Sequence, residues 1–220
     1  MCHGQSKNFD AAIFDFNEDL KSQRAQPNRG NNTLLAGITA HNLGVLHVLA
    51  GKDDASLPLF EEAITRKREA FGADHPEVAI SLDEIGIQYF ARKMFVESLE
   101  SFNEARRIRA LEVGDNYHHP KMAMVLNNVA CCNFQMGYHD DALKTLQEAR
   151  DILSHATGTT TTADLDLLHV AITHCNYAYL LLRSKKYEEA RAIFEDALLV
   201  RVWFFYRFTA RFLDTFSHRI

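Results

Sequence analysis

Apolar residues recur along this chain with the spacing of an α-helix, in two neighbouring segments. In the first segment Leu82, Ile85 and Tyr89 fall three and four residues apart. In the second, Phe102 and Ala105 continue the same kind of spacing. Such spacing places the apolar side chains on one face of a helix. The pattern predicts two amphipathic helices joined by a short turn.

This two-helix unit occurs four times, and two sets of small residues have fixed places in it. They are Gly44, Gly86, Ala130 and Ala178 in the first helices, and Ala63, Ala105, Ala149 and Ala197 in the second. The second set is spaced by 42, 44 and 48 residues. Paired helices pack about 8–10 Å apart, and a small residue at the contact permits the closer end of that range. We expect the rings of Phe60, Phe102 and Phe194 to fill the space beside these contacts.

Turn-forming residues mark the ends of the predicted helices. Gly51 and Gly137 fall in the turns inside a unit. Between units, Gly72 follows one helix and Pro76 opens the next, so either Asp74 or the histidine after it caps that helix.

Composition agrees with a helical protein and narrows its function. Glycine and proline together make 14 of 220 residues, about 6% against a usual total of about 12%, which argues against a turn-rich β fold. A net charge of −5 does not suit a nucleic-acid binder. The chain has four cysteines and no apolar stretch long enough to span a membrane, and we expect a cytoplasmic protein.

The histidines and cysteines bear on catalysis and metal binding. None of the histidines forms an HExxH motif, and Cys131 with Cys132 lacks the spacing of zinc ligands. A glycine-rich phosphate loop is also missing from the sequence. We therefore expect no enzyme activity, no metal and no cofactor.

The small-residue pattern resembles the tetratricopeptide repeat. Its period of 42 residues, the junction over 72–79 and the run over 126–130 are similar to the repeats of kinesin light chains. The resemblance implies an all-α fold, a right-handed superhelical solenoid of antiparallel helix pairs. The expected organisation is a lone helix, or half repeat, with a linker over 1–32, four repeats over 33–201 (about 33–75, 76–119, 120–162 and 163–201), and an aromatic, basic helical tail over 202–220.

In such solenoids the first helices line a concave groove that binds peptides. The predicted groove residues are Asn42, Val45, Glu84, Ile87, Asn127, Asn128, Phe134, Asn176 and Tyr179. A side-chain amide offers both a donor and an acceptor to a peptide backbone, and the resemblance implies this role for Asn42, Asn128 and Asn176. The alternative is that these asparagines cap or bridge neighbouring helices and touch no ligand. Glu84 and the residue before it make one stretch acidic, which disfavours acidic peptides.

The sequence thus predicts a non-enzymatic scaffold that binds a protein or peptide in its groove, as a kinesin-light-chain-like cargo adaptor with a kinesin-related partner. The alternative is a regulatory or structural repeat segment of a larger multidomain protein, or a truncated fragment without an independent ligand.

The tail over 202–220 places a phenylalanine at every fourth position, beside several arginines. Three interpretations stay open for it: a cap on the open end of the solenoid, a translated intron or frameshift, or a membrane or partner contact.

Overall fold

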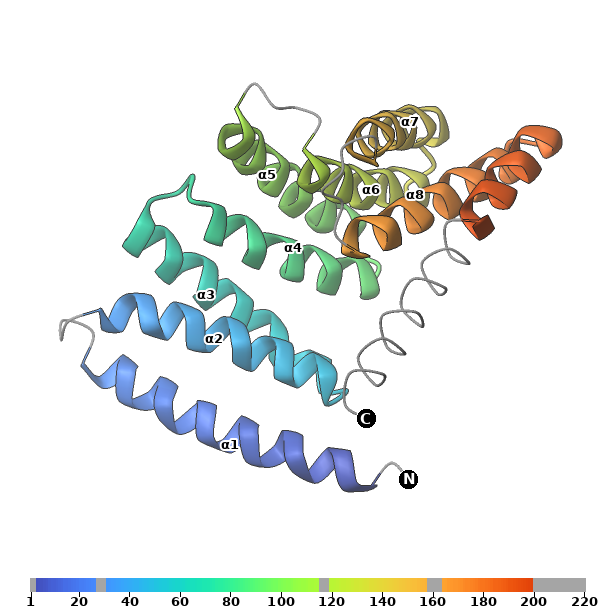
Figure 1. Cartoon of the computed structure of the whole chain (residues 1–220). Helices are drawn as coiled ribbons and strands as arrows, with labels where there is room; N and C mark the ends of the chain where they lie inside the picture. Colours follow the sequence, from blue (N-terminus) through green and yellow to red (C-terminus); the bar gives the residue numbers. More distant parts are fainter. Residues whose placement is uncertain (1–2, 27–30, 115–118, 158–163, 200–220) are drawn as a thin grey trace, which may run out of the picture. The chain divides into compact units, whose positions relative to one another are not determined.

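The computed structural model describes residues 3–26, 31–114, 119–157 and 164–199, so the tail over 202–220 lies outside the described residues. The described residues form helices joined by turns, with no strand among them (Figure 1). The helices are α1 (His3–Ala25), α2 (Asn32–Leu49), α3 (Ser56–Phe71), α4 (Pro76–Ala91), α5 (Phe95–Val113), α6 (Pro120–Gln135), α7 (His139–Thr157), α8 (Asp164–Arg183), the helical residues 187–199 and the 3-10 turn η1 (Asp53–Ala55).

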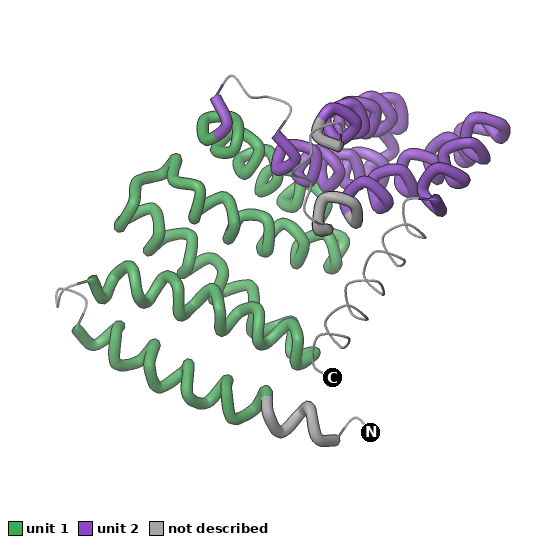
Figure 2. Tube along the Cα trace, viewed as in Figure 1, with its two compact units in different colours: residues 1–112 green, residues 113–220 purple. Residues whose placement is uncertain are grey.

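The chain divides into two compact units (Figure 2). Unit 1 covers residues 1–112, and within it α1 packs on α2, α2 on α3, and α3 on α4. Unit 2 covers residues 113–220, and in it α6 packs on α7, while α8 contacts both. Consecutive helices run in opposite directions inside each unit (Figure 1). The predicted all-α class of antiparallel helix pairs is confirmed.

Small residues sit where the helices of a pair touch, as predicted. A Cβ atom added to Gly86 would lie 2.7 Å from Cε1 of Phe102, and one added to Gly44 would lie 2.8 Å from Cε1 of Phe60. Both rings are buried, with 0% exposure for Phe60 and 2% for Phe102. The ring of each second helix therefore occupies the space that a side chain on the first helix would need.

Residues with positive φ close the turn inside each helix pair. Gly51 and Gly137 have φ angles of 69° and 87°, in the left-handed region that glycine enters without steric cost. Lys93 and Lys185 stand at the equivalent turns with φ angles of 63°. The sequence pattern pointed to the two glycines and missed the two lysines, because a lysine carries no signal of a left-handed backbone.

Histidines cap two of the first helices. His75, and not Asp74, is the cap of α4, since its Nδ1 accepts a hydrogen bond from the N–H of Glu77 at 3.2 Å. His119 caps α6 in the same way through the N–H of Lys121, also at 3.2 Å. A proline follows each cap, at a position where its missing N–H costs nothing.

We expect Gly86→Ala to lower the free energy of unfolding by about 1–3 kcal/mol, because the added methyl group meets a buried ring. This loss comes despite the better helix propensity of alanine, worth about 1 kcal/mol. Urea unfolding followed by circular dichroism measures it.

Phe102→Leu is the companion change, since it opens space for the new methyl group. Gly86→Ala combined with Phe102→Leu should cost less than the sum of the two single changes. Strict additivity would show that the glycine and the ring are not in contact.

Candidate functional site

The nine predicted groove residues all lie on the first helices, α2 and α4 in unit 1 and α6 and α8 in unit 2. We call the solvent-facing side of α2 and α4 the unit 1 face, and that of α6 and α8 the unit 2 face. None of the nine side chains is buried: three are exposed and six are half-buried. The exposed ones are Asn42, Ile87 and Tyr179, and the half-buried ones are Val45, Glu84, Asn127, Asn128, Phe134 and Asn176.

Two asparagines of the unit 2 face are bonded to each other across α6 and α8. The Nδ2 group of Asn176 donates to Oδ1 of Asn127 at 2.9 Å and lies 3.7 Å from Sγ of Cys131. Asn176 therefore does bridge neighbouring helices, as the alternative interpretation held. The bond uses one end of each amide, however. Among the described residues, Nδ2 of Asn127 and Oδ1 of Asn176 have no partner, so one donor and one acceptor remain for a ligand.

An aromatic pair adjoins the two amides. The rings of Phe134 and Tyr179 meet edge to face with their centroids 5.7 Å apart. Tyr179 follows Asn176 by three residues and Phe134 follows Asn127 by seven, which are helical steps along one side of each helix. On the other side of the amides, Ile172 is 41% exposed. Along the unit 2 face, the apolar Ile172, the two amides and the aromatic pair thus follow one another in this order.

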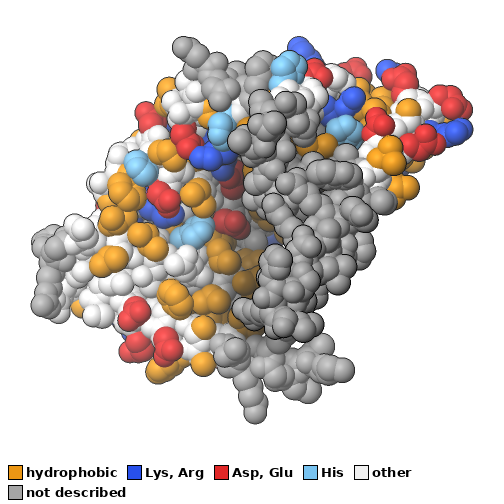
Figure 3. All heavy atoms as spheres, in the orientation of Figure 1, with side chains coloured by type: hydrophobic (Ala, Val, Ile, Leu, Met, Phe, Trp, Pro, Cys, Tyr) orange, Lys and Arg blue, Asp and Glu red, His pale blue; other side chains and the backbone are white. Residues whose placement is uncertain are grey.

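The unit 1 face is apolar and acidic. Ile38, Ile80 and Ile87 are exposed large hydrophobic residues on α2 and α4. Hydrophobic side chains gather over these helices in the space-filling view, with acidic ones among them (Figure 3). Of the two adjacent acids predicted here, only Glu84 keeps an uncompensated charge. The carboxylate of Asp83 is held by the guanidinium of Arg109 on α5, whose Nη1 lies 3.0 Å from Oδ1 of Asp83.

Burial acts on the carboxyl group of Glu84. Loss of solvent and the neighbouring negative charge of Asp83 both raise the pKa of Glu84 above its ordinary value. Among the described residues Glu84 has no ion-pair or hydrogen-bond partner. The carboxylate therefore stands on the unit 1 face with nothing to offset its charge.

His41 joins the two first helices of unit 1. Its Nδ1 lies 3.1 Å from Oγ of Ser81 on α4, and its ring meets the edge of the Phe60 ring at a centroid distance of 5.7 Å. Burial, and then the positive charge of Lys67, lower the pKa of His41 to about 4, while Glu77 opposes this in part. The imidazole is consequently neutral at neutral pH and acts as a fixed link between α2 and α4.

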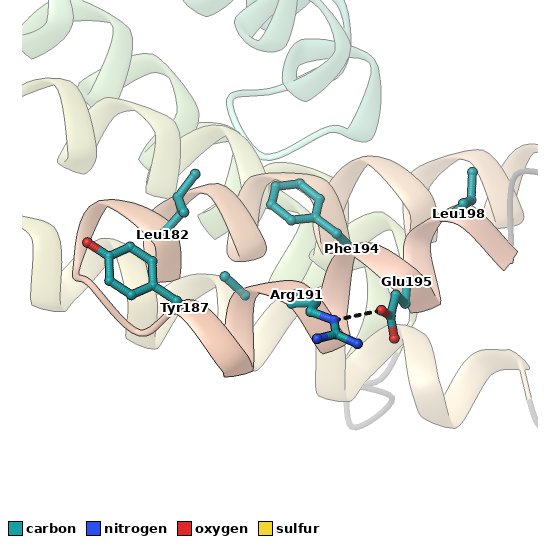
Figure 4. Close-up of a pocket in the computed structure, with 7 residues that line it drawn as sticks. Leu182, Tyr187, Arg191, Phe194, Glu195 and Leu198 are labelled. Atoms are coloured by element: carbon teal, nitrogen blue, oxygen red, sulfur yellow. Dashed lines mark hydrogen bonds and ion pairs between the residues drawn. The ribbon is translucent and has the colours of Figure 1, made fainter.

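An apolar hollow of about 360 Å³ lies at the end of unit 2, between α8 and the helical residues 187–199 (Figure 4). Its lining residues are Leu182, Tyr187, Ala190, Arg191, Phe194, Glu195 and Leu198. Phe194 is less buried than its counterparts Phe60 and Phe102, since the residue is 38% exposed. Among the lining residues, Leu182 is 43% and Leu198 is 62% exposed.

No group of three or more histidine, cysteine, aspartate or glutamate side chains among the described residues is arranged to hold a metal ion. No described helix is both long and apolar enough to cross a bilayer.

Models of the tetratricopeptide repeat match residues 35–110 and 171–201. The chain therefore carries tetratricopeptide repeats, which are typical scaffolds of protein–protein interaction.

Within that class it resembles kinesin light chains. It is 29% identical over 130 residues to Protein KINESIN LIGHT CHAIN-RELATED 3 of Arabidopsis thaliana, a match that spans 59% of this chain and 20% of that protein.

Two solved structures share the fold. BtubC (BKLC) from P. vanneervenii has a TM-score of 0.75 at 16% identity, and the match covers 90% of this chain and 75% of that one. A putative kinesin light chain with nearly identical repeats from Podospora anserina has a TM-score of 0.70 at 16% identity, covering 90% and 88%. At this level of identity the likeness establishes the fold alone.

The lowered pKa of His41 makes stability depend on pH. Below about pH 6.5 an unfolded histidine binds a proton that the folded His41 does not bind until about pH 4. Stability is therefore lost as the pH falls between these values. From pH 7 to pH 4, the wild type should lose about 1–3 kcal/mol more free energy of unfolding than His41→Gln.

Urea unfolding at several pH values measures this difference. The comparison isolates His41, because every other titrating group is the same in both proteins, and glutamine can still bond to Ser81. Parallel pH profiles of the two proteins would contradict the assignment.

Proposed function

We propose that this chain is a non-enzymatic interaction module that binds an extended peptide along its first-helix faces. The amide pair of Asn127 and Asn176 carries the proposal. It offers one free donor and one free acceptor between the exposed Ile172 and the Phe134–Tyr179 pair. A peptide unit has the matching acceptor and donor in its C=O and N–H groups.

This geometry suits recognition of a backbone without regard to its sequence. Each hydrogen bond from an amide to a peptide contributes about 1 kcal/mol, and the apolar zones on either side add contacts with side chains. Ile172 and the Phe134–Tyr179 pair supply those zones. Asn128 is half-buried on the same helix as Asn127 and belongs to the proposed site.

The partner we propose is a peptide segment of another protein, in the manner of a kinesin-light-chain-like cargo adaptor, and the setting we propose is the cytoplasm. The names of the similar proteins support this choice. The domain boundaries predicted from the sequence belong to the same proposal.

The apolar hollow of Figure 4 favours a second candidate, a repeat segment that packs against further helices of a larger protein. Phe60 and Ile64 hold the equivalent places in the first repeat, and they are 0% and 7% exposed. In the last repeat Phe194 and Leu198 are 38% and 62% exposed. A covering helix would bury these side chains.

A random nonapeptide library displayed on phage and panned against the full chain tests peptide binding. We expect enriched sequences whose synthetic versions bind the wild type, as measured by fluorescence anisotropy. Asn127→Ala with Asn176→Ala should weaken them about five- to twentyfold, because up to two hydrogen bonds are lost. Asn103→Ala on α5 is the matched control and should change affinity less than twofold.

Asn127→Asp separates ligand binding from helix bridging. An aspartate still accepts the hydrogen bond from Asn176 but lacks the free donor, so peptide affinity should fall while stability is retained. Asn103→Asp controls for the added charge. The proposal fails when no peptide is enriched, or when affinity survives both changes at the amide pair.

A further inference from the structure

We infer that the unit 1 face selects a peptide with a lysine or arginine side chain, which pairs with Glu84 and is flanked by aliphatic residues that pack on Ile80 and Ile87. This inference rests on the proposed peptide-binding function and adds the chemical class of the ligand. It concerns unit 1 alone.

The three side chains form one stripe along α4. Ile80 precedes Glu84 by four residues and Ile87 follows it by three, so all three share one side of the helix. The two isoleucines are 42% and 45% exposed, and Ile38 on α2 is 38% exposed. The stripe is thus a carboxylate set between accessible aliphatic groups.

Glu84 differs from every comparable acid of unit 1. Five carboxylates are half-buried among the described residues of this unit. Four of them have a cationic partner, in the pairs Glu62–Arg66, Glu77–Lys67, Asp83–Arg109 and Glu104–Arg107. Glu84 is the fifth and has no cation within the part of the chain that the structure describes. The charges of the other four are compensated by ion pairs inside the protein, and the charge of Glu84 is available to pair with a ligand.

A basic side chain of a ligand suits both the carboxylate and the aliphatic groups of the stripe. A carboxylate that has lost part of its water gains more from a cation than an exposed one does. Lysine and arginine also carry aliphatic stems that lie along apolar surface while the charged group reaches its partner. An acidic peptide would place like charges together. The equivalent position is Asn42, Asn128 or Asn176 in the other repeats, so the charge preference belongs to this repeat.

The same nonapeptide library tests the inference when panned in parallel against the full-length wild type, Glu84→Gln and Glu100→Gln. Glu100 is exposed on α5, so it gives a matched loss of one charge away from the stripe. Wild type and Glu100→Gln should enrich lysine and arginine at one peptide position at least about threefold over the input. Glu84→Gln should lose that enrichment, and Glu84→Lys should enrich aspartate and glutamate there.

Affinity measurements give a second test that leaves the protein unchanged. In an enriched peptide, replacing the basic residue with norleucine should weaken wild-type binding about three- to tenfold and Glu84→Gln binding less than twofold. Enriched peptides that need Asn127 but show no basic preference would overturn this inference and leave peptide binding standing. Equal preference in wild type and Glu84→Gln would also overturn it. Failure to enrich any peptide removes the proposed function and this inference together.

Discussion

The contact between Gly86 and the ring of Phe102 sets how closely the two helices of a pair approach. No side chain fits at Gly86, since an added Cβ would lie 2.7 Å from the ring. The same contact recurs between Gly44 and Phe60. Because it fixes the rotation of each first helix, it also fixes which residues point away from the pair. In α4 these are Ile80, Glu84 and Ile87, and in α2 they include Asn42. The proposed binding faces are therefore a consequence of how the pairs pack.

Features that depend on one helix or one pair were predictable from the sequence. Small residues at helix contacts, a histidine or aspartate cap before Pro76 and glycines in two turns follow from local geometry. Contacts between particular polar side chains were not predictable, because the sequence does not say which of them meet. The bond from Asn176 to Asn127, between two pairs, and the ion pair of Asp83 with Arg109, inside one pair, are of this kind. They change the predicted site, since they consume one end of each amide and one of two adjacent charges.

The two faces are built on the same backbone plan but differ in chemistry. In the last repeat, in unit 2, the position two residues before the small residue is Asn176, which shares its amide with α6. In the second repeat, in unit 1, the equivalent residue is Glu84, a carboxylate without a cation among the described residues. The packing residues are nearly constant between repeats, and the face residues vary. A repeat fold can therefore change its ligand without changing its core.

Half-buried groups with unused bonding capacity lower the stability of the free protein. A partly desolvated carboxylate and an amide with an unpaired donor have each lost hydration. The interactions that they make inside the folded protein do not fully replace it. His41 shows the opposite arrangement, since its burial keeps it neutral and its Nδ1 lies within hydrogen-bonding distance of Ser81. In unit 1, α2 and α4 are thus linked by the neutral imidazole of His41, while the unit 1 face beside it carries the unpaired carboxylate of Glu84. A ligand cation that pairs with Glu84 binds only the folded chain. Its binding therefore raises the free energy of unfolding, which the unpaired carboxylate lowers in the free protein.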